Sequence, residues 1–341
     1  MSQVAVMGAG AWGTTFAAVL ADAGNDVVLW ARSPGLAETI TGQHANPGYT
    51  QGLVLPDRVT ASADASGVLS GAEAAFLALP AQHLGPWLSR WRPYLGVDVV
   101  LVSLAKGVEV GTGRRMSEVI AATTDVPTRR IAVFTGPNLA PEIAARQPTA
   151  AVIACSDHEV AWRLQGMCRT GYLRSYTHTD VVGAEIAGAS KNVIALAVGM
   201  ADGLGYGANT QAALATRGLA EIARLGTALG AQEATFAGLA GMGDLMATCL
   251  SPLSRNRCLG VHLGAGRSVE QARRIVGATA EGLTSATALL GLARAHAVEV
   301  PLIEQVERVV HTGRLARDVV DTLMRRDARP ERDRPRGPHL A

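Results

Sequence analysis

The sequence of 341 residues has few charged side chains and almost no lysine. Charged residues make up 18% of the chain, and the formal net charge is only +2. A nucleic-acid interface normally needs a clustered excess of basic side chains, so the composition predicts no nucleic-acid partner and favours small anions as ligands. Of the 31 basic residues, only Lys106 and Lys191 are lysine. Burial or a neighbouring cation lowers the pKa of lysine but leaves arginine charged, so both lysines are candidates for catalysis.

Cysteine is also scarce, and no long apolar run is present. The four cysteines are Cys155, Cys168, Cys249 and Cys258. They show neither CxxC spacing nor a matching histidine pattern, which predicts no zinc or other metal site and no disulfide framework. No uninterrupted apolar stretch reaches the roughly 18 residues that suggest a membrane span. A strand-like run follows Met1 without a charged leader, so we expect a cytoplasmic protein.

The chain is long enough for two domains with separate cores. Up to about residue 180, apolar runs rich in β-branched residues alternate with helical stretches, a pattern typical of a doubly wound, mostly parallel sheet. The predicted strands are Gln3–Met7, Asp26–Trp30, Ala74–Leu79, Val97–Leu104, Arg130–Phe134, Ala150–Ala154 and Tyr172–Tyr176. Residues 1–180 are therefore predicted to form an α/β Rossmann domain.

Residues 181–327 have helical spacing and are predicted to form an all-α domain. The predicted helices are Ala184–Met200, Gln211–Leu229, Ser268–Ile275, Thr284–His296, Leu302–Val310 and Leu315–Met324. Gly241–Asp244 and Ser251–Arg257 are predicted to be turn-rich links between helices. Residues 328–341 are rich in arginine and proline and are predicted to form a disordered tail.

A glycine motif follows the first predicted strand. Gly8, Gly10 and Gly13 form G-x-G-x-x-G, and a helix is predicted from Trp12 to Leu20. In this context the first glycine permits a tight turn, the second lets a pyrophosphate approach the backbone, and the third allows the helix to pack closely. The helix N-terminus adds amide donors for the phosphates. The motif therefore predicts a dinucleotide site.

The residue after the second predicted strand bears on which dinucleotide binds. That strand usually ends in an acidic residue when the site holds the ribose of NAD, whereas here it continues Trp30-Ala31-Arg32. Arginine pairs with a 2′-phosphate or stacks on adenine, so NADP should be accepted. NAD is not excluded, and Arg32 as a merely solvated charge stays open.

Three further segments carry polar groups suited to a small phosphorylated ligand. Lys106 and Gly136-Pro137-Asn138 each follow a predicted strand, at the edge where open α/β sheets bind ligands. Lys191 lies within an alanine-rich helix, where a charge needs a partner or a function. Ser254-Arg255-Asn256 offers hydroxyl, guanidinium and amide donors, although the same residues suit an ordinary helix cap.

Together these segments resemble the bacterial-type NAD(P)-dependent glycerol-3-phosphate dehydrogenases. The matching stretches are GAGAWGT at 8–14, LAKGVE at 104–109, GPN at 136–138, SKNVIALAVGMADGLGYGAN at 190–209, TRGLAEIARLG at 216–226, GLAGMGDLMATC at 238–249 and SPLSRNR at 251–257. They run in order across most of the chain, and SPLSRNR and the KNVIA helix are far more specific than the glycine motif. The resemblance implies reversible hydride transfer between NADPH or NADH and dihydroxyacetone phosphate, which gives sn-glycerol 3-phosphate for glycerophospholipid synthesis.

The resemblance also implies roles for individual residues, with Lys191 as the catalytic acid and base. The implied substrate-binding residues are Lys106, Gly136, Asn138, Lys191, Asp244, Ser254, Arg255 and Asn256. The implied cofactor-binding residues are Gly8, Gly10, Ala11, Trp12, Gly13, Arg32, Lys106, Ala140, Arg255, Thr279 and Glu281. Asp244 as a brace of its turn and Glu281 as a surface residue stay open as alternatives.

Four positions depart from the family pattern. Ala11 replaces a serine, Ser33 stands where a second basic residue often follows Arg32, Asn138 replaces serine or threonine, and Thr279 replaces a common valine. Ala11 removes a hydroxyl beside the pyrophosphate, and Ser33 weakens the case for strict NADP preference. Neither lysine is affected.

Two other functions are compatible with parts of the sequence. A β-hydroxyacid dehydrogenase or ketopantoate reductase also combines a Rossmann domain with helices and a lysine, but such enzymes lack SPLSRNR. A nucleotide-sensing protein without turnover would have no need of the two lysines. The sequence does not determine the oligomeric state, and a homodimer is one of the states compatible with it.

Overall fold

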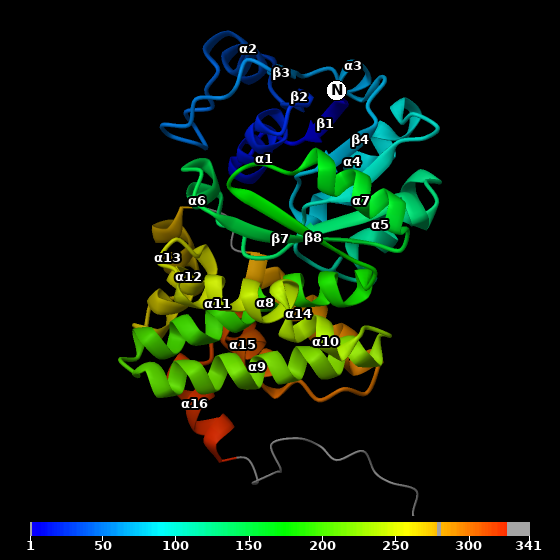
Figure 1. Ribbon diagram of the computed structural model, residues 1–341. Helices are drawn as coiled ribbons and strands as arrows, with labels where there is room; N and C mark the ends of the chain where they lie inside the picture. Colours follow the sequence, from blue (N-terminus) through cyan, green and yellow to red (C-terminus); the bar gives the residue numbers. More distant parts are fainter. Residues whose placement is uncertain (1, 278–280, 326–341) are drawn as a thin grey trace, which may run out of the picture.

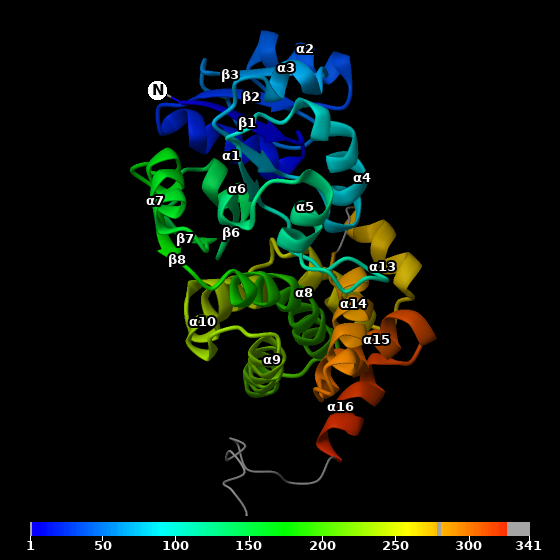
Figure 2. The same ribbon diagram turned by 90° about the vertical axis from the view of Figure 1, so that its right-hand side faces the viewer.

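The computed structural model describes residues 2–277 and 281–325. An N-terminal α/β part holds a single eight-stranded sheet, and the described chain after residue 180 is helical (Figure 1). In Figures 1 and 2 the helical part lies below the sheet, and α8 (Val181–Gly203) is its helix nearest to the strands. The predicted fold class, a Rossmann-type α/β part followed by helices, is confirmed.

The sheet has the strand order β3-β2-β1-β4-β5-β6-β7-β8. Its strands are β1 Gln3–Met7, β2 Asp26–Trp30, β3 Val59–Ser62, β4 Ala74–Leu77, β5 Val100–Ser103, β6 Ile131–Thr135, β7 Thr149–Cys155 and β8 Leu173–His178. All neighbouring strands are parallel except β6 and β7. The short edge strand β3 was not predicted, and several other predicted strands extend beyond the observed ends by a few residues.

Helices cover both faces of the sheet, as the apolar strands require. Alternate residues of β1 enter two different cores: Val4 and Val6 pack with α1, whereas Ala5 and Met7 pack with α4 and α5. The helices of this part are α1 Ala11–Asp22, α2 Pro34–Gln43, α3 Ala65–Leu69, α4 Ala81–Trp91, η1 Arg92–Tyr94, α5 Met116–Thr124, η2 Thr128–Arg130, α6 Ala140–Ala144 and α7 His158–Met167. The parallel strands therefore end together at one edge of the sheet, beside the loops that carry the predicted site residues.

The second half is built from helices packed around α8. They are α9 Ala208–Ala228, α10 Glu233–Ala237, η3 Leu239–Gly243, α11 Asp244–Leu250, α12 Arg255–Gly264, α13 Val269–Val276, α14 Glu281–Ala295, α15 Pro301–Thr312 and α16 Ala316–Met324. Of the two segments predicted as turn-rich links, Gly241–Asp244 is helical, and that prediction is wrong. Ser251–Arg257 does begin with a turn, and only its part from Arg255 onward belongs to α12. A π-helical turn, η3, runs directly into α11, and Ser254 caps α12 by accepting from the Arg257 amide. The predicted tail, residues 328–341, lies outside the described residues.

Within the described residues, α8 is the one helix long and apolar enough to cross a membrane. Of its most apolar window, 89% is buried inside the protein. It contacts α9, α11, α12 and α14 and is covered by them. Its apolar character therefore comes from its place in the core of the helical part.

Glycines let α8 and α12 cross with their backbones in contact. A Cβ on Gly199 would lie 2.1 Å from the Arg257 carbonyl oxygen, and one on Gly260 would lie 2.3 Å from the Leu196 carbonyl oxygen. Any side chain at these positions would push the two helices apart. The close crossing brings the first turn of α12, with Arg255 and Asn256, beside the segment of α8 that carries Lys191.

Candidate active site

The three glycines of the G-x-G-x-x-G motif have different surroundings. Gly8 has φ +129°, and a Cβ there would lie 2.5 Å from the Ala78 carbonyl oxygen. A Cβ on Gly13 would lie 1.9 Å from the Gly8 carbonyl oxygen, so the loop and α1 pack too closely for a side chain. A Cβ on Gly10 would meet nothing within 4 Å. Gly8 and Gly13 are thus required by packing, whereas Gly10 leaves open space above the loop.

That open space lies at the start of α1, where helix amides point away from the helix and suit the oxygens of a phosphate. Gly10 is the N-cap residue, and Ala11 and Trp12 begin the helix without a side-chain cap. In the described chain, none of these three amides donates to another backbone group. The Trp12 side chain is partly exposed, and its ring centroid lies 5.3 Å from that of Phe16.

The other predicted cofactor residues lie around the same edge of the sheet. Arg32 follows β2, is exposed, and has no hydrogen-bond or ion-pair partner in the described part of the chain. Ala140 begins α6 after β6. Glu281 begins α14, where burial raises the pKa of its carboxyl group against the opposing charges of Arg255, Lys106 and Lys191. Thr279 lies outside the described residues.

A carboxylate shared by both lysines forms the centre of the site. Lys106, which follows β5, donates from Nζ to Asp244 Oδ2 at 2.7 Å and to the Gly136 carbonyl oxygen at 2.9 Å. Lys191 of α8 donates to Asp244 Oδ1 at 2.5 Å. Asp244 is 0% exposed, and among the described residues the two lysines are its ion-pair partners. The structure therefore brings together four residues predicted separately from distant segments.

Close packing fixes where the two ammonium groups lie. The stem of Lys106 passes over Gly188 of α8, where a Cβ would lie 3.7 Å from Lys106 Cγ. Burial lowers the pKa of Lys106 to about 8; the Lys191 charge also lowers it, and the Asp244 charge raises it. Lys106 is therefore mostly protonated at neutral pH but loses its proton only slightly above it.

Thr248 belongs to the cluster although it was not predicted. Lys191 Nζ donates to Thr248 Oγ1 at 2.8 Å, and Thr248 Oγ1 donates to the Asp244 carbonyl oxygen at 2.6 Å. Thr248 lies four residues after Asp244 on α11, hence on the same helix face. That spacing would have identified it had the segment been interpreted as a helix.

The predicted residues of α12 serve both the helix and the site. The Asn256 side chain donates to Asn192 Oδ1 at 2.9 Å and accepts from the Gly282 amide at 3.0 Å, so it joins α8, α12 and α14. Ser254 is buried as the N-cap, the alternative left open by its sequence. Arg255 is exposed and interacts electrostatically with Glu281. Of these residues, Arg255 has its donors available to a ligand.

Asn138 also has unused hydrogen-bonding groups. It lies between β6 and α6, just beyond Gly136, whose carbonyl binds Lys106. Both polar atoms of its side chain are buried and find no partner among the described residues. A buried amide without partners is unfavourable unless a ligand or water satisfies it. Asn138, two residues after the glycine that binds Lys106, therefore has polar atoms available to a ligand or to water.

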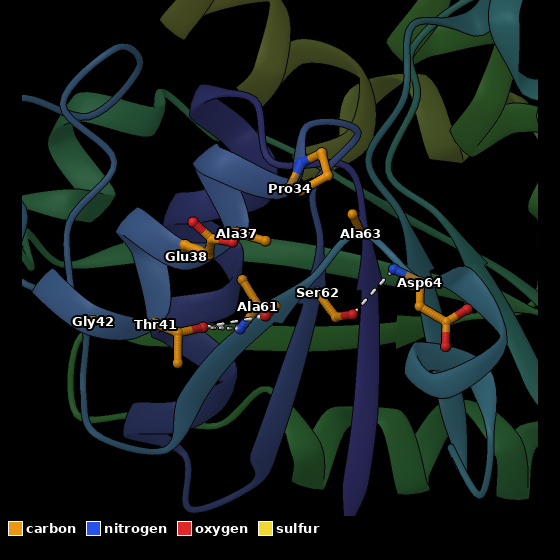
Figure 3. A pocket seen from close by; sticks show the side chains of 9 residues that line it. All are labelled: Pro34, Ala37, Glu38, Thr41, Gly42, Ala61, Ser62, Ala63 and Asp64. Atoms are coloured by element: carbon orange, nitrogen blue, oxygen red, sulfur yellow. Dashed lines mark hydrogen bonds between the residues drawn. The ribbon is translucent and has the colours of Figure 1, made fainter.

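A cavity among the described residues lies elsewhere. It has a volume of about 560 Å³ and opens between α2 and the end of the edge strand β3 (Figure 3). It is lined by Pro34, Ala37, Glu38, Thr41, Gly42, Ala61, Ser62, Ala63 and Asp64. None of these is a predicted site residue, and three strands separate β3 from β5, which precedes Lys106. The cavity is thus not part of the lysine cluster.

Comparison with known proteins identifies the family. Residues 3–161 match the model of the NAD-dependent glycerol-3-phosphate dehydrogenase N-terminus, and residues 180–321 match that of the C-terminus. The chain belongs to the NAD-dependent glycerol-3-phosphate dehydrogenase family. The NAD(P)+ glycerol-3-phosphate dehydrogenase of Streptomyces griseus is 54% identical over 330 residues, which cover 97% of this chain and 98% of the relative. The resemblance stated from the sequence motifs is thereby confirmed.

Solved structures of this dehydrogenase family share the whole architecture. Glycerol-3-phosphate dehydrogenase from Coxiella burnetii superposes with a TM-score of 0.91 at 34% identity, and the match covers 95% of this chain and 99% of that one. A ketopantoate reductase from Ralstonia eutropha, of the class considered as a rival, reaches a TM-score of 0.57 at 18% identity and covers 94% of this chain and 99% of that one. The latter likeness concerns the fold alone.

Proposed function

We propose that this protein catalyses the NAD(P)-linked interconversion of dihydroxyacetone phosphate and sn-glycerol 3-phosphate. The observation that carries the proposal is the Lys106–Asp244–Lys191 cluster at the carboxyl edge of the sheet, in a chain of this dehydrogenase family. NAD(P)H is the cofactor, and the product is the backbone precursor of glycerophospholipids. The enzyme therefore supplies phospholipid synthesis.

The lysine cluster is suited to a dianionic phosphate ester with a ketone group. An ammonium group has three hydrogen-bond donors. In the described chain Lys106 uses two of them, on Gly136 and Asp244, and Lys191 uses two, on Asp244 and Thr248. One donor on each lysine is left for the substrate, and two lysines opposite one carboxylate leave a net positive charge.

Lys191 is the proposed acid and base of the reaction. When bound, NAD(P)H supplies the hydride that reduces the ketone carbon. The ketone oxygen then gains negative charge, which the Lys191 ammonium stabilises and protonates; general acids of this kind typically contribute about 10² to 10⁴-fold to the rate. In the reverse direction neutral Lys191 takes the proton from the alcohol. Asp244 and Thr248 hold Nζ in place, which orients the proton in both directions.

Substrate grip is assigned to the residues around the cluster. Arg255 provides a guanidinium group for the phosphate, and Asn138 and the Gly136 backbone bind polar atoms of the ester. Asn256 and Ser254 act indirectly, because their hydrogen bonds hold the first turn of α12, which contains Arg255. If Arg255 binds the phosphate, Arg255→Ala raises the Michaelis constant for the substrate; an unchanged constant contradicts this role.

The dinucleotide is assigned to the glycine loop and the residues beside it. Gly8, Gly10 and Gly13 shape the loop, and the amides of Ala11 and Trp12 face the pyrophosphate. Arg32 at the end of β2 lies where a 2′-phosphate would be recognised. Ala140, Glu281 and Thr279 complete the proposed cofactor set.

The domain division at residue 180, a homodimer and a cytoplasmic location are part of the same proposal. The largest core cluster of the helical part includes only Val108 from before residue 180, which supports domains at 1–180 and 181–327. The half-exposed apolar side chains of Met242, Met246 and Leu250 on one face of η3 and α11 support a subunit contact. Light scattering during gel filtration tests the homodimer.

The activity is tested by NADPH oxidation in the presence of different carbonyl substrates. We expect rapid oxidation with dihydroxyacetone phosphate and none with ketopantoate or a panel of 2-keto acids. Oxidation with another carbonyl alone would overturn the substrate assignment while leaving the dinucleotide site intact. Tight NADPH binding without any turnover would indicate a nucleotide-sensing protein.

A further inference from the structure

A buried asparagine outside the predicted site is bonded to the glycine loop. Asn46 lies after α2 and is 0% exposed. Its Nδ2 donates to the Ala9 carbonyl oxygen at 2.9 Å and to Thr14 Oγ1 at 2.8 Å. Ala9 lies between the first two glycines of the motif, and Thr14 lies in the first turns of α1. Asn46 therefore uses both amide hydrogens to tie the loop to its helix.

The bond to Ala9 controls the direction of the next amide. The Ala9 carbonyl and the Gly10 N–H belong to one planar trans peptide and point in opposite directions. Asn46 holds the carbonyl toward the buried side, so the Gly10 N–H is held away from it. In the described chain that N–H donates to no other backbone group. It is therefore available at the loop surface where the pyrophosphate is assigned.

The orientation of the asparagine amide follows from its partners. Because the Ala9 carbonyl can only accept a hydrogen bond, the side-chain nitrogen must face it. Asn46 Oδ1 is then left buried without a partner among the described residues. A bridge needed only for stability would normally avoid an unpaired buried oxygen. Asn46 thus holds the glycine loop in place although its own Oδ1 is left without a hydrogen bond.

We propose that Asn46 is a positioning residue for the cofactor, which sets the Gly10 N–H and the start of α1 in their binding geometry before the dinucleotide arrives. The inference rests on the NAD(P) site of the proposed function. Without Asn46, the Ala9 peptide turns more freely, and part of the binding free energy is spent on ordering it. The expected consequence is weaker cofactor binding with little effect on the chemical step.

The test compares two buried asparagines that brace opposite ends of α1. Asn25 is 5% exposed and donates to the carbonyl oxygens of Leu20 at 2.7 Å and Met167 at 2.9 Å, far from the glycine loop.

In the full-length protein, the Kd of NADPH is measured by fluorescence titration, and the Tm is measured without cofactor. We expect Asn46→Ala to raise the Kd about ten-fold, as the loss of about one good hydrogen bond would. At saturating NADPH, kcat should be unchanged within about two-fold. Asn25→Ala should lower the Tm and leave the Kd unchanged.

The outcomes separate this inference from the proposed function. If Asn46→Ala lowers the Tm but leaves the Kd of NADPH unchanged, the bridge is only structural and the inference is overturned. If Asn46→Ala does not fold, Asn46→Leu keeps a side chain of similar size that donates to neither Ala9 nor Thr14, and a several-fold rise in Kd is expected; an unchanged Kd overturns the inference again. Failure of the wild-type protein to bind NADPH would instead refute the cofactor site itself.

Discussion

Replacing Asp244 with asparagine removes the charge that two buried lysines share. The pKa of Lys106 is about 8, the net result of burial and the Lys191 charge, which lower it, and of the Asp244 charge, which raises it. The carboxylate oxygen lies 2.7 Å from Lys106 Nζ. Loss of an opposite charge at this range typically changes a pKa by about 1 to 3. In Asp244→Asn, the pKa of Lys106 is therefore expected at about 7 or below. Its ammonium form, which attracts the phosphate ester, then persists only at lower pH.

The assay is the pH dependence of kcat/KM for dihydroxyacetone phosphate reduction between about pH 6 and about pH 9. For the wild type we expect a fall above about pH 8, where Lys106 loses its proton. In Asp244→Asn, kcat/KM should begin to fall about 1 to 3 pH units lower than in the wild type. Its value should also be lower by about 10²-fold or more across the whole pH range. Asp202→Asn is the control, because Asp202 also lies on a helix of this region and pairs with Arg257 at 2.8 Å. If kcat/KM of Asp244→Asn and of the wild type fell at the same alkaline pH, Asp244 would not control the pKa of Lys106 and the prediction would be refuted.

Three further predictions follow from the site and the core. Lys191→Ala should lower kcat by about 10² to 10⁴-fold while the Kd of NADPH is retained; substantial turnover would rule out its role as the acid. Arg32→Ala should weaken NADPH binding without changing NADH binding, and equal losses in two titrations would exclude recognition of the 2′-phosphate. Burial raises the pKa of Glu221 from 4.5 to about 7, so its stabilising contribution is complete below about pH 4.5 and is lost as the pH rises through about 7. Glu221→Gln should therefore gain stability relative to wild type between about pH 5 and pH 8, by up to about 3 kcal/mol; a constant difference in Tm would contradict this.

The fold could be predicted wherever local pattern and burial agree. Strands buried on both faces, such as β1 and β2, were found at their observed bounds because continuous apolar runs are typical of a parallel sheet. The edge strand β3, with the sequence Val-Thr-Ala-Ser, has no such run and was missed. Its pairing with β2 depends on tertiary contact, which periodicity does not report.

The helical segments around the site were missed for a related reason. Gly241 and Gly243 are typical of a turn, yet they lie in a π-helical stretch packed so closely that a Cβ on Gly241 would lie 2.1 Å from the Phe236 carbonyl oxygen. The glycines allow close packing there, whereas the sequence pattern suggested a chain reversal. Thr248 was missed as a consequence, because its position beside Lys191 follows from the helix. The sequence did identify both lysines and Asp244, but it does not contain the distances between them.

The near absence of lysine can now be related to the geometry of the site. An arginine at position 191 would keep its charge at every working pH and could not exchange a proton with the substrate. At position 106 burial is the largest influence and lowers the pKa to about 8, while the charge of Asp244 raises it and that of Lys191 lowers it further. A bound dianionic phosphate ester would add negative charge beside the same ammonium and raise that pKa again. Substrate binding and protonation of Lys106 therefore favour each other. This coupling requires a lysine that is buried and beside another cation, and the crossing of α8 and α12, with α11 alongside, creates such a place.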